Sequence, residues 1–351
     1  MFKYSFAGFL LKKMAKIAFF ELEKFGLGNK KDYVVQFLKG HEVVFFDEPL
    51  SEEDADKAKD CEAIAFFIYS SVTDSILRKL EKVKLIATMS TGFDHIDIEA
   101  CRKRGILACN VPAYGDNTVA EHGMALLLAI SRKLVPSIER AKKGDFTLDN
   151  LRGFDLKGKT LGILGTGKIG RNMAHFAEGF GMKVIAFDKF PNDALARECG
   201  FTYVSLDQLL AESDVISLHL PENPETHHII NLDNVRKIKK GCVLINTARG
   251  GLIETEAILV GLKEGIFSAC GLDVLEEEYA IKEEAELLHE TFKKTRDLRT
   301  LLEEHILIQQ PNVLITPHNA FNSTEALMRI LDTTIDNMNA FFSGVPKNKI
   351  T

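Results

Sequence analysis

The stretch LGILGTGKIGRNMAHFAEGFGMKVIAFD, residues 161–188, decides the fold of this 351-residue chain. It reads as an apolar strand, a turn with Gly165, Gly167 and Gly170, a helix, and a second strand that ends on Asp188. In that order the first glycine permits the tight turn, the second lets the backbone approach a pyrophosphate, and the third lets helix and strand pack closely. The start of the helix aims free N–H groups at phosphate oxygens. The segment therefore predicts a βαβ unit that binds a dinucleotide.

The acid that ends the second strand indicates which dinucleotide is bound. Asp188 lies where a carboxylate would hydrogen-bond the ribose of an adenosine. An acid there repels the extra phosphate of NADP, so the sequence favours NAD. A glycine pattern by itself is weak and often marks only a helix C-cap or a loop. Here the strand, helix, second strand and terminal acid all follow in order, which makes the pattern specific.

Composition sets the broad class of protein. A hydrophobic content of 46% and a charged content of 27% are ordinary for a globular protein, and 351 residues suggest two domains. The net charge of -6 argues against an extended nucleic-acid-binding surface. The six cysteines form no CxxC pair and mostly lie in apolar runs, so they indicate buried free thiols in a reducing compartment. We predict neither a disulfide framework nor a metal site.

Membrane and secretion signals are weak. No window of the sequence approaches the roughly 18 apolar residues of a membrane span. The apolar stretch within residues 1–13 is short for a signal peptide and lacks a small-residue cleavage site. We therefore expect a cytoplasmic protein with no membrane partner.

Short apolar β-rich runs alternate with amphipathic stretches along most of the chain, which predicts parallel sheets with helices on both faces. Before the glycine turn, we expect strands at 15–20, 42–46, 63–69, 84–90 and 105–110, with helices at 31–39, 74–82 and 97–104. From the turn onward, we expect strands at 160–164, 183–187, 214–219, 242–246, 267–272 and 313–316. The predicted fold class is α/β, with two doubly wound parallel-sheet domains.

Three further segments complete the predicted organisation. Residues 117–143 read as one long interdomain helix, capped by Asn117 or Thr118 and bent at Pro136. Residues 279–310 read as a charged helical surface insertion, whose apolar stripe is Leu287, Leu288, Leu298, Leu301 and Leu302. Residues 323–342 form an amphipathic helix that returns to the first layer. The domains are then 1–112 with 320–351, and 113–319 inserted between them.

Charged or titratable groups follow three of the later strands, at the strand ends where ligands bind in an open α/β sheet. Arg249 precedes two glycines that permit close approach, and its guanidinium is a rigid fork suited to a carboxylate and a neighbouring carbonyl. Acids, beginning with Asp273, follow the strand at 267–272, and His318 follows the strand at 313–316. Taken singly, these groups are also explained by surface ion pairs, solvated charge or a surface histidine.

Taken together, the three groups fit hydride transfer between a nicotinamide and the carbon of a 2-keto or 2-hydroxy acid. Arg249 would fix the carboxylate and polarise the carbonyl group. His318 would donate the proton to the nascent alkoxide, and a carboxylate beside it would favour the imidazolium form.

Several ordered motifs then make a family resemblance specific. From Met14 to about Gly344 the chain resembles the D-isomer-specific 2-hydroxyacid dehydrogenase family. The motifs are GTGKIG (165–170), HLPENPETHHIIN (219–231), NTARGGLIETEAI (246–258), GLDVLEEE (271–278) and TPHNAF (316–321). The resemblance implies that Arg249 binds substrate, that His318 is the proton donor, and that Glu278 pairs with His318. Glu278 is preferred to Glu276 or Glu277 because of its spacing from Arg249.

The resemblance also implies the positions that bind NAD and substrate. For NAD these are Gly165, Gly167, Lys168, Ile169, Gly170, Asp188 at the ribose, His219, Leu220 and Pro221 near the adenosine, Thr226, Thr247 and Ala248 at the nicotinamide ribose, and Asp273 at the carboxamide. For the substrate they are Thr91 and Gly92, in a loop whose amides hold the carboxylate, together with Tyr114, Arg249 and Phe321.

Within the family the chain most resembles the D-lactate dehydrogenase branch, which implies reduction of pyruvate to D-lactate with NADH. Tyr114 and Phe321 would crowd the pocket and favour a methyl side chain, although ordinary interdomain packing also explains them. The alternatives are an enzyme for branched or aromatic 2-keto acids, a glyoxylate or hydroxypyruvate reductase, and an NAD(H)-sensing corepressor-like protein. The resemblance implies a Rossmann NAD domain inserted in a flavodoxin-like substrate domain. We expect a homodimer without a nucleic-acid partner.

Overall fold

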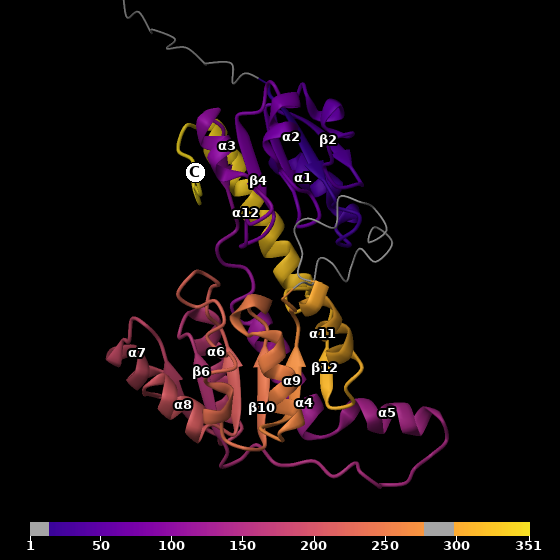
Figure 1. Ribbon diagram of the computed structural model, residues 1–351. Helices are drawn as coiled ribbons and strands as arrows, with labels where there is room; N and C mark the ends of the chain where they lie inside the picture. The colour runs from indigo at the N-terminus through magenta and orange to yellow at the C-terminus, as the bar shows by residue number, and fades with distance from the viewer. Residues whose placement is uncertain (1–13, 277–297) are drawn as a thin grey trace, which may run out of the picture. The chain divides into compact units, whose positions relative to one another are not determined.

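The computed structural model describes residues 14–276 and 298–351, and it separates the chain into two compact units (Figure 1). Unit 1 comprises Met1–Tyr114 and Ser323–Thr351, and unit 2 comprises Gly115–Asn322. The chain therefore leaves unit 1, builds unit 2 and returns. None of the helices in the described ranges combines the length and apolarity needed to cross a membrane.

Unit 1 contains a five-stranded parallel sheet with the order β2-β1-β3-β4-β5. Its strands are β1 (Lys16–Phe20), β2 (Glu42–Phe46), β3 (Ala63–Phe66), β4 (Leu85–Thr88) and β5 (Leu107–Cys109). This is the strand order of flavodoxin-like sheets. The helices are α1 (Lys31–Phe37), α2 (Asp74–Lys79), α3 (Ile98–Lys103) and α12 (Thr324–Phe342). Helix α12 contacts β4, so the C-terminal part of the chain completes the first domain.

Unit 2 contains a seven-stranded parallel sheet with the order β12-β11-β10-β9-β6-β7-β8. The strands are β6 (Thr160–Leu164), β7 (Lys183–Phe187), β8 (Thr202–Tyr203), β9 (Val215–Leu218), β10 (Cys242–Asn246), β11 (Phe267–Leu272) and β12 (Val313–Ile315). Counted from β6, this is the order 3-2-1-4-5-6 of dinucleotide-binding sheets with one more strand added. The order in which the strands are added reverses between the parallel neighbours β6 and β9, and the glycine turn follows β6.

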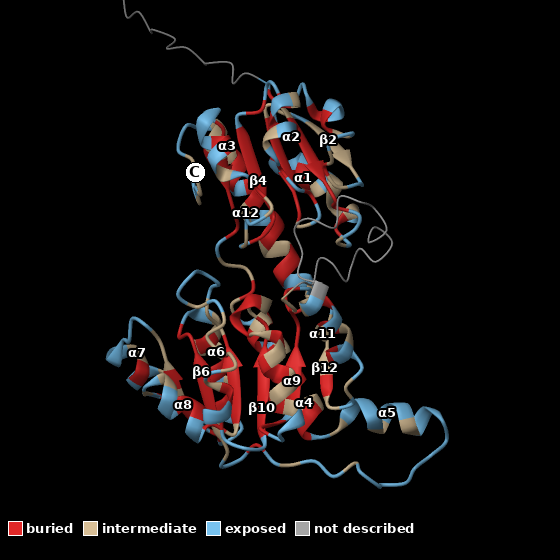
Figure 2. Ribbon diagram, viewed as in Figure 1, coloured by how far each residue is buried: buried red, intermediate tan, exposed pale blue. Residues whose placement is uncertain are grey.

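Each face of this sheet has its own apolar core (Figure 2). Alternate strand residues point to opposite faces, so Val243 belongs to one core and Leu244 to the other. One face is covered by α4 (Thr118–Ser131), α6 (Lys168–Gly179) and α7 (Asp193–Glu198). The other is covered by α8 (Leu206–Glu212), α9 (Thr255–Lys263) and α11 (Leu298–Ile308). The predicted fold class of two doubly wound α/β domains is confirmed.

The prediction of one long helix at 117–143 is wrong. The segment forms α4 and a separate helix, α5 (Leu134–Lys142), and the break between them falls at Lys133, whose φ is 53°. Pro136 explains the break because its ring would clash with the carbonyl of Arg132 in a continuous helix. Asn117 occupies the N-cap position but its side chain donates to Glu121 instead of capping. Helix α4 packs on β10 and β11 of unit 2, so it is part of that unit and not a separate helix between the two domains.

The other differences between the predicted and the observed elements are smaller. Strand β3 ends at Phe66, earlier than predicted, because the N–H of Phe67 donates to the buried carboxylate of Glu21 at 2.5 Å. The two-residue strand β8 was not predicted. Leu302 is 63% exposed and so does not belong to the apolar stripe of α11, whereas Leu301 is buried. Leu287, Leu288, Glu277, Glu278 and the side chain of Leu298 lie outside the described residues.

Candidate active site

Every predicted site segment of unit 2 follows a strand of its parallel sheet, so all of them lie at one edge, the carboxyl ends. The strand order puts the segments after β7, β6 and β9 on one side and those after β10, β11 and β12 on the other. The first group carries Gly165, Asp188 and His219, and the second carries Arg249, Asp273 and His318. The predicted pyrophosphate and adenosine-side residues therefore fall in the first group, and the predicted substrate and nicotinamide-side residues fall in the second.

The glycine turn has the shape that a pyrophosphate requires. Gly165 has a φ of 98°, and a Cβ there would lie 2.7 Å from the carbonyl oxygen of His219. A Cβ on Gly170 would lie 2.0 Å from the carbonyl oxygen of Gly165, so only glycine lets helix and strand pack this closely. Around a Cβ on Gly167 there is nothing within 4 Å, which leaves space beside the N-cap of α6. Lys168, the first residue of α6, pairs with Asp116 at 3.2 Å.

Asp188 joins the end of β7 to the glycine turn. One of its carboxylate oxygens accepts from the N–H and the hydroxyl of Thr166, at 2.8 and 2.9 Å. The other accepts from the N–H of Phe190 at 2.9 Å. The Thr166 hydroxyl is also 2.8 Å from the hydroxyl of Tyr203, on the unpredicted strand β8. The carboxylate is therefore fixed at the sheet edge beside the turn.

The segment after β9 carries the predicted adenosine-side residues. The Nε2 atom of His219 is 2.9 Å from the hydroxyl of Ser217, and burial lowers the pKa of His219 to about 4. The imidazole is therefore neutral at physiological pH. Thr226 donates to the carbonyl oxygen of Pro221 at 2.6 Å and accepts from the N–H of Asn223 at 2.9 Å, which closes the loop that follows Leu220.

The segment after β10 offers a buried hydroxyl to a ligand. The Oγ1 atom of Thr247 is buried and has no hydrogen-bond partner among the residues that the structure describes. Such a group is costly unless a ligand or water satisfies it. A ribose hydroxyl at this edge would do so, and this fits the NAD that the glycine turn predicts. The neighbouring N–H of Ala248 is occupied, because it donates to the side chain of Asn246 at 3.0 Å.

Arg249 begins a tight turn at the same edge. Its carbonyl oxygen accepts from the Asn246 side chain at 2.9 Å, and its guanidinium donates to the carbonyl oxygen of Ala248 at 2.7 Å. The Arg249 side chain is half-buried, and it forms no ion pair with a carboxylate among the described residues. The turn therefore keeps the guanidinium available for an anionic ligand.

Asp273, the first residue after β11, is a buried carboxylate that organises the segment after β12. Its oxygens accept from the N–H groups of Asn319 and Ala320, both at 2.8 Å, and from the hydroxyl of Thr316. The Nε2 atom of His122 on α4 lies 3.4 Å from the same carboxylate. Burial by itself would raise the pKa of Asp273, but these hydrogen bonds outweigh burial and lower it. Asp273 is thus ionised in the folded protein.

His318 lies directly within this network. It has a φ of 51°, a conformation that side-chain-bearing residues seldom adopt, and its N–H donates to the carbonyl oxygen of Asp273 at 2.9 Å. The ring of Phe321 meets the His318 imidazole edge-on, with centroids 6.4 Å apart. The structure therefore fixes the backbone of the predicted proton donor and sets an aromatic ring beside it.

The predicted acidic partner of His318, Glu278, lies outside the described residues. Glu276 is described, and its carboxylate binds the Nε2 atom of His228 at 2.6 Å and the hydroxyl of Thr255 at 2.8 Å. Glu276 is therefore engaged by His228 and Thr255.

The remaining predicted substrate residues belong to unit 1. Thr91 donates through its hydroxyl to the carbonyl oxygen of Val111 at 2.7 Å, and the Gly92 carbonyl oxygen accepts from Ser90 at 2.6 Å. The Tyr114 carbonyl oxygen accepts from Arg329 of α12 at 2.6 Å. These bonds shape the loops after β4 and β5 within unit 1.

Sequence reasoning missed two sets of residues. One is His122 with Thr316, which share a hydrogen bond of 3.0 Å beside Asp273. The other is the set formed by His228, Thr255 and Glu276. Each set joins distant parts of the chain, so no local pattern indicates the contact. Only the position of Thr316 at the end of one predicted strand, and of Glu276 shortly after another, could have drawn attention to them.

Comparison with known proteins shows which family the chain resembles. The family model for the D-isomer specific 2-hydroxyacid dehydrogenase NAD binding domain matches residues 124–320. The chain is 35% identical to the D-lactate dehydrogenase of Escherichia coli over 333 residues, 92% of this chain and 97% of that protein. It is 37% identical to a 2-hydroxyacid dehydrogenase homolog of Zymomonas mobilis over 311 residues, 87% and 91% of the two chains. The crystal structure of the Aquifex aeolicus D-lactate dehydrogenase with NAD and lactic acid matches with a TM-score of 0.81 and 36% identity, covering 95% of this chain and 98% of that one.

Proposed function

Because this chain belongs to the D-isomer specific 2-hydroxyacid dehydrogenase family, and is an NAD-dependent oxidoreductase, we propose that it reduces pyruvate to D-lactate. The observation that carries the proposal is the order β12-β11-β10 in the sheet. It puts His318, Asp273 and Arg249 after three adjacent strands, next to the strands that carry the nucleotide-binding segments. Relatives named D-lactate dehydrogenase support the choice of substrate.

The proposed cofactor contacts follow the sheet edge. The glycine turn, with Lys168 and Ile169, holds the pyrophosphate, and Asp188 accepts from the adenosine ribose. His219, Leu220, Pro221 and Thr226 line the adenosine side. Thr247 and Ala248 face the nicotinamide ribose, and the hydroxyl of Thr247 gains there the partner that it lacks in the protein alone. Asp273 lies beside the carboxamide.

The proposed chemistry assigns one task to each side chain. When bound, NADH supplies a hydride to the carbonyl carbon of the keto acid. Arg249 binds the carboxylate through its fork of N–H donors and polarises the carbonyl oxygen. As the carbon–oxygen double bond becomes single, His318 donates a proton to that oxygen, and the product is a neutral hydroxyl group. Glu278 pairs with His318.

We propose that residues 1–112 and 320–351 form the substrate-binding domain and residues 113–319 the NAD-binding domain, with bounds a few residues away from those of unit 1 and unit 2. The loop of Thr91 and Gly92 presents backbone amides to the substrate carboxylate. Tyr114 and Phe321 limit the space for the substrate side chain, which favours methyl over branched or aromatic groups. Relatives named glycerate dehydrogenase and D-2-hydroxyisocaproate dehydrogenase show that other acids are used in this family, so size selection needs a direct test.

The experiment that tests the function is steady-state oxidation of NADH with 2-keto acids of increasing size. The panel contains glyoxylate, pyruvate, hydroxypyruvate, 4-methyl-2-oxovalerate and phenylpyruvate. We expect the highest kcat/KM with pyruvate. A higher value with glyoxylate or hydroxypyruvate would indicate a reductase for those acids, and one with the larger acids would indicate a broader dehydrogenase. Binding of NADH without turnover of any acid would indicate an NAD(H)-sensing protein.

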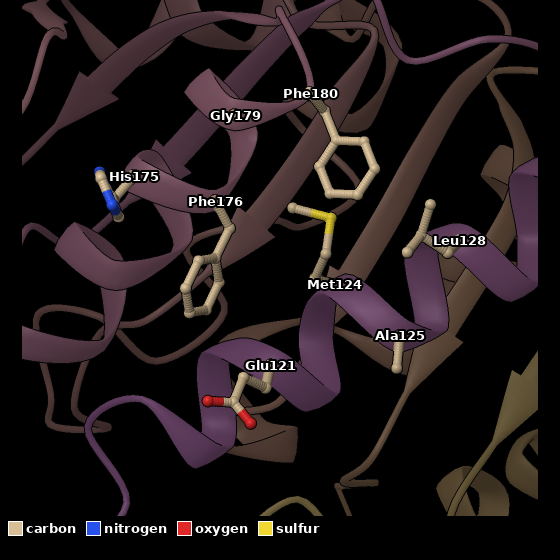
Figure 3. Close-up of a pocket in the computed structure, with 8 residues that line it drawn as sticks. All are labelled: Glu121, Met124, Ala125, Leu128, His175, Phe176, Gly179 and Phe180. Atoms are coloured by element: carbon tan, nitrogen blue, oxygen red, sulfur yellow. The ribbon is translucent and has the colours of Figure 1, made fainter.

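We propose a homodimer because unit 2 carries both an apolar groove and exposed apolar side chains. The groove runs between α4 and α6, where Met124 and Leu128 face Phe176 and Phe180 (Figure 3). Helix α5 and the segment after it extend away from the sheet (Figure 1) and expose Phe146 and Leu148, at 81% and 83%. A second copy would cover both features, since each copy supplies a groove and an apolar extension.

The cysteines support a cytoplasmic location. All six are free thiols, and five of them are buried. Burial raises the pKa of Cys61, Cys101 and Cys109 to about 11, which keeps these thiols protonated and unreactive. Such cysteines suit a reducing compartment.

A further inference from the structure

Glu276 has two oxygens, and each one joins the segment after β11 to a different part of unit 2. One oxygen lies 2.6 Å from the Nε2 atom of His228, in the loop between β9 and β10. The other accepts from the hydroxyl of Thr255 at 2.8 Å and from its N–H at 3.2 Å, at the start of α9. The side chain of Glu276 is only 18% exposed, and an acid suits the N-terminus of a helix. The carboxylate therefore connects three segments of the chain.

The two segments that Glu276 joins also hold the Arg249 turn between them. The N–H of His228 donates to the carbonyl oxygen of Gly251 at 2.8 Å. Two residues on, the N–H of Ile230 donates to the carbonyl oxygen of Leu252 at 3.3 Å. The turn η4 (Gly250–Leu252) begins directly after Arg249 and ends three residues before Thr255. Moving His228 or Thr255 would therefore move the backbone that carries the guanidinium.

The third segment packs on the other side of the same turn. A Cβ on Gly250 would lie 2.0 Å from the carbonyl oxygen of Leu275 and 2.4 Å from the N of Glu276. The backbone of the turn thus rests on the peptide that precedes the Glu276 side chain. Gly251 is equally enclosed, because its Cβ would lie 2.1 Å from a carboxylate oxygen of Glu222. The turn is thus enclosed at both glycines, so its position depends on how these segments are held together.

The same cluster contains three groups that commonly bind metals, but its geometry favours hydrogen bonding. Ligand-type atoms of His227, His228 and Glu276 lie within 4.8 Å of one another. However, the two imidazole rings are stacked, with centroids 3.9 Å apart and planes 21° apart. Ring nitrogens bind metals in the plane of the ring, so parallel stacked rings do not direct both lone pairs at one ion. Both oxygens of Glu276 are also already engaged.

We propose that Glu276 is a positioning residue that acts through Arg249: it holds His228 and Thr255 so that the turn between them aims the guanidinium at the substrate carboxylate. The inference rests on the proposed function, because it assigns Arg249 to the keto acid. It adds a residue with no contact to substrate or cofactor in that scheme. A guanidinium binds a planar carboxylate best through two parallel N–H···O bonds. A small shift of the turn would misalign these bonds and weaken binding of the keto acid.

The experiment compares Glu276→Ala and Glu276→Gln in the full-length protein. Glutamine keeps the length, can accept from Thr255 and can donate to His228, whereas alanine releases both partners. We expect Glu276→Ala to raise KM for pyruvate and Kd for oxamate about tenfold, with Kd for NADH within about twofold of wild type. Glu276→Gln should stay within about threefold for all three constants. The matched control is Glu264→Ala, which removes an exposed carboxylate that pairs with Arg236 at the opposite end of α9.

A double-mutant cycle with Arg249→Lys separates positioning from general support of the fold. Lysine keeps the positive charge but lacks the planar pair of N–H donors. Substrate affinity should therefore depend less on the orientation of the turn. We expect Glu276→Ala to raise the oxamate Kd less than about twofold in this background, against about tenfold in wild type. Equal effects in both backgrounds would overturn the inference. If Glu276→Ala does not fold, Thr255→Val and His228→Asn each release one partner and enter the same cycle.

The two proposals fail in different ways. Wild-type protein that reduces no 2-keto acid would overturn the proposed function together with this inference. Active wild-type protein with additive effects in the cycle, or with Glu276→Ala indistinguishable from Glu264→Ala, would overturn the inference alone.

Discussion

The N–H of His318 donates a hydrogen bond to the carbonyl oxygen of Asp273 at 2.9 Å, between the segments that follow β12 and β11. The Asp273 carboxylate then accepts from the next two N–H groups, those of Asn319 and Ala320. His318 has a φ of 51°, and a conformation of this kind persists only where the surroundings impose it. One buried acid thus fixes the backbone of the residue that we propose as proton donor.

Replacing His318 by glutamine tests the proton donor. The amide keeps a polar side chain but cannot donate a proton as an acid, so we expect kcat to fall by about 10²–10⁴. Kd for NADH, measured by fluorescence titration, should stay near the wild-type value because the nucleotide-binding segments follow other strands. The control is His175→Gln, an exposed histidine of α6 in the same unit. Turnover that survives His318→Gln unchanged would show that another group donates the proton.

Asp188 is predicted to set the preference for NAD over NADP. Asp188→Asn removes the charge that repels a 2′-phosphate, while the amide oxygen can still accept from the N–H of Thr166 or Phe190. We expect the ratio of kcat/KM for NADPH to that for NADH to rise by about tenfold or more. The measurement is steady-state reduction of pyruvate with each cofactor. An unchanged ratio would assign the preference to a different group.

Glu21 should make the stability of the protein depend on pH. It is fully buried after β1, and burial raises its pKa from 4.5 to about 7, against opposing hydrogen bonds from Phe67 and Ser70. A raised pKa means that the folded state binds the proton more tightly, so this contribution is full below about pH 4.5 and is lost as pH rises through about 7. Between these two pH limits, the contribution of Glu21 to the free energy of unfolding changes by about 3 kcal/mol.

Glu21→Gln should therefore make the free energy of unfolding depend less on pH. The variant keeps an oxygen that can accept from the N–H of Phe67, and its free energy of unfolding should exceed that of wild type above pH 7. The measurement is chemical denaturation of both proteins at several pH values between 4.5 and 8. Parallel curves for the two proteins would contradict the assignment.

Phe180 tests the proposed dimer face. It is 43% exposed and lines the groove between α4 and α6. A charge buried in an apolar contact is costly, so Phe180→Asp should shift the protein from dimer to monomer in sedimentation velocity. The control is Phe190→Asp, because Phe190 is 77% exposed but lies outside the groove. A dimer that tolerates Phe180→Asp, or a wild-type monomer, would contradict the proposal.

The sequence predicted the strands of unit 2 well because their pattern is strong. The apolar runs at β6, β7, β10 and β11 begin and end where predicted, since each lies in the sheet between two helical layers. The glycine turn was equally clear, because each glycine serves a separate steric purpose. Local patterns of this kind can be recognised without knowledge of the rest of the fold.

Features that depend on contacts between distant segments could not be predicted in the same way. The break at Lys133 is a local effect that was predicted in part: Pro136 indicated a bend, whereas the structure ends one helix and begins another there. The bonds from His122 and Thr316 to Asp273, and from His228 and Thr255 to Glu276, connect residues far apart in the chain. An acidic run such as the one from Glu276 looks like solvated charge until the fold supplies its partners.

In the proposed reaction, Arg249 and His318 hold a 2-keto acid in one orientation beside the nicotinamide. The most direct measurement is chiral analysis of the lactate formed from pyruvate and NADH by wild-type protein, with the rate of NADH oxidation followed in parallel. We expect one mole of D-lactate per mole of NADH and no L-lactate. A racemic or L-configured product, or no consumption of NADH, would contradict it.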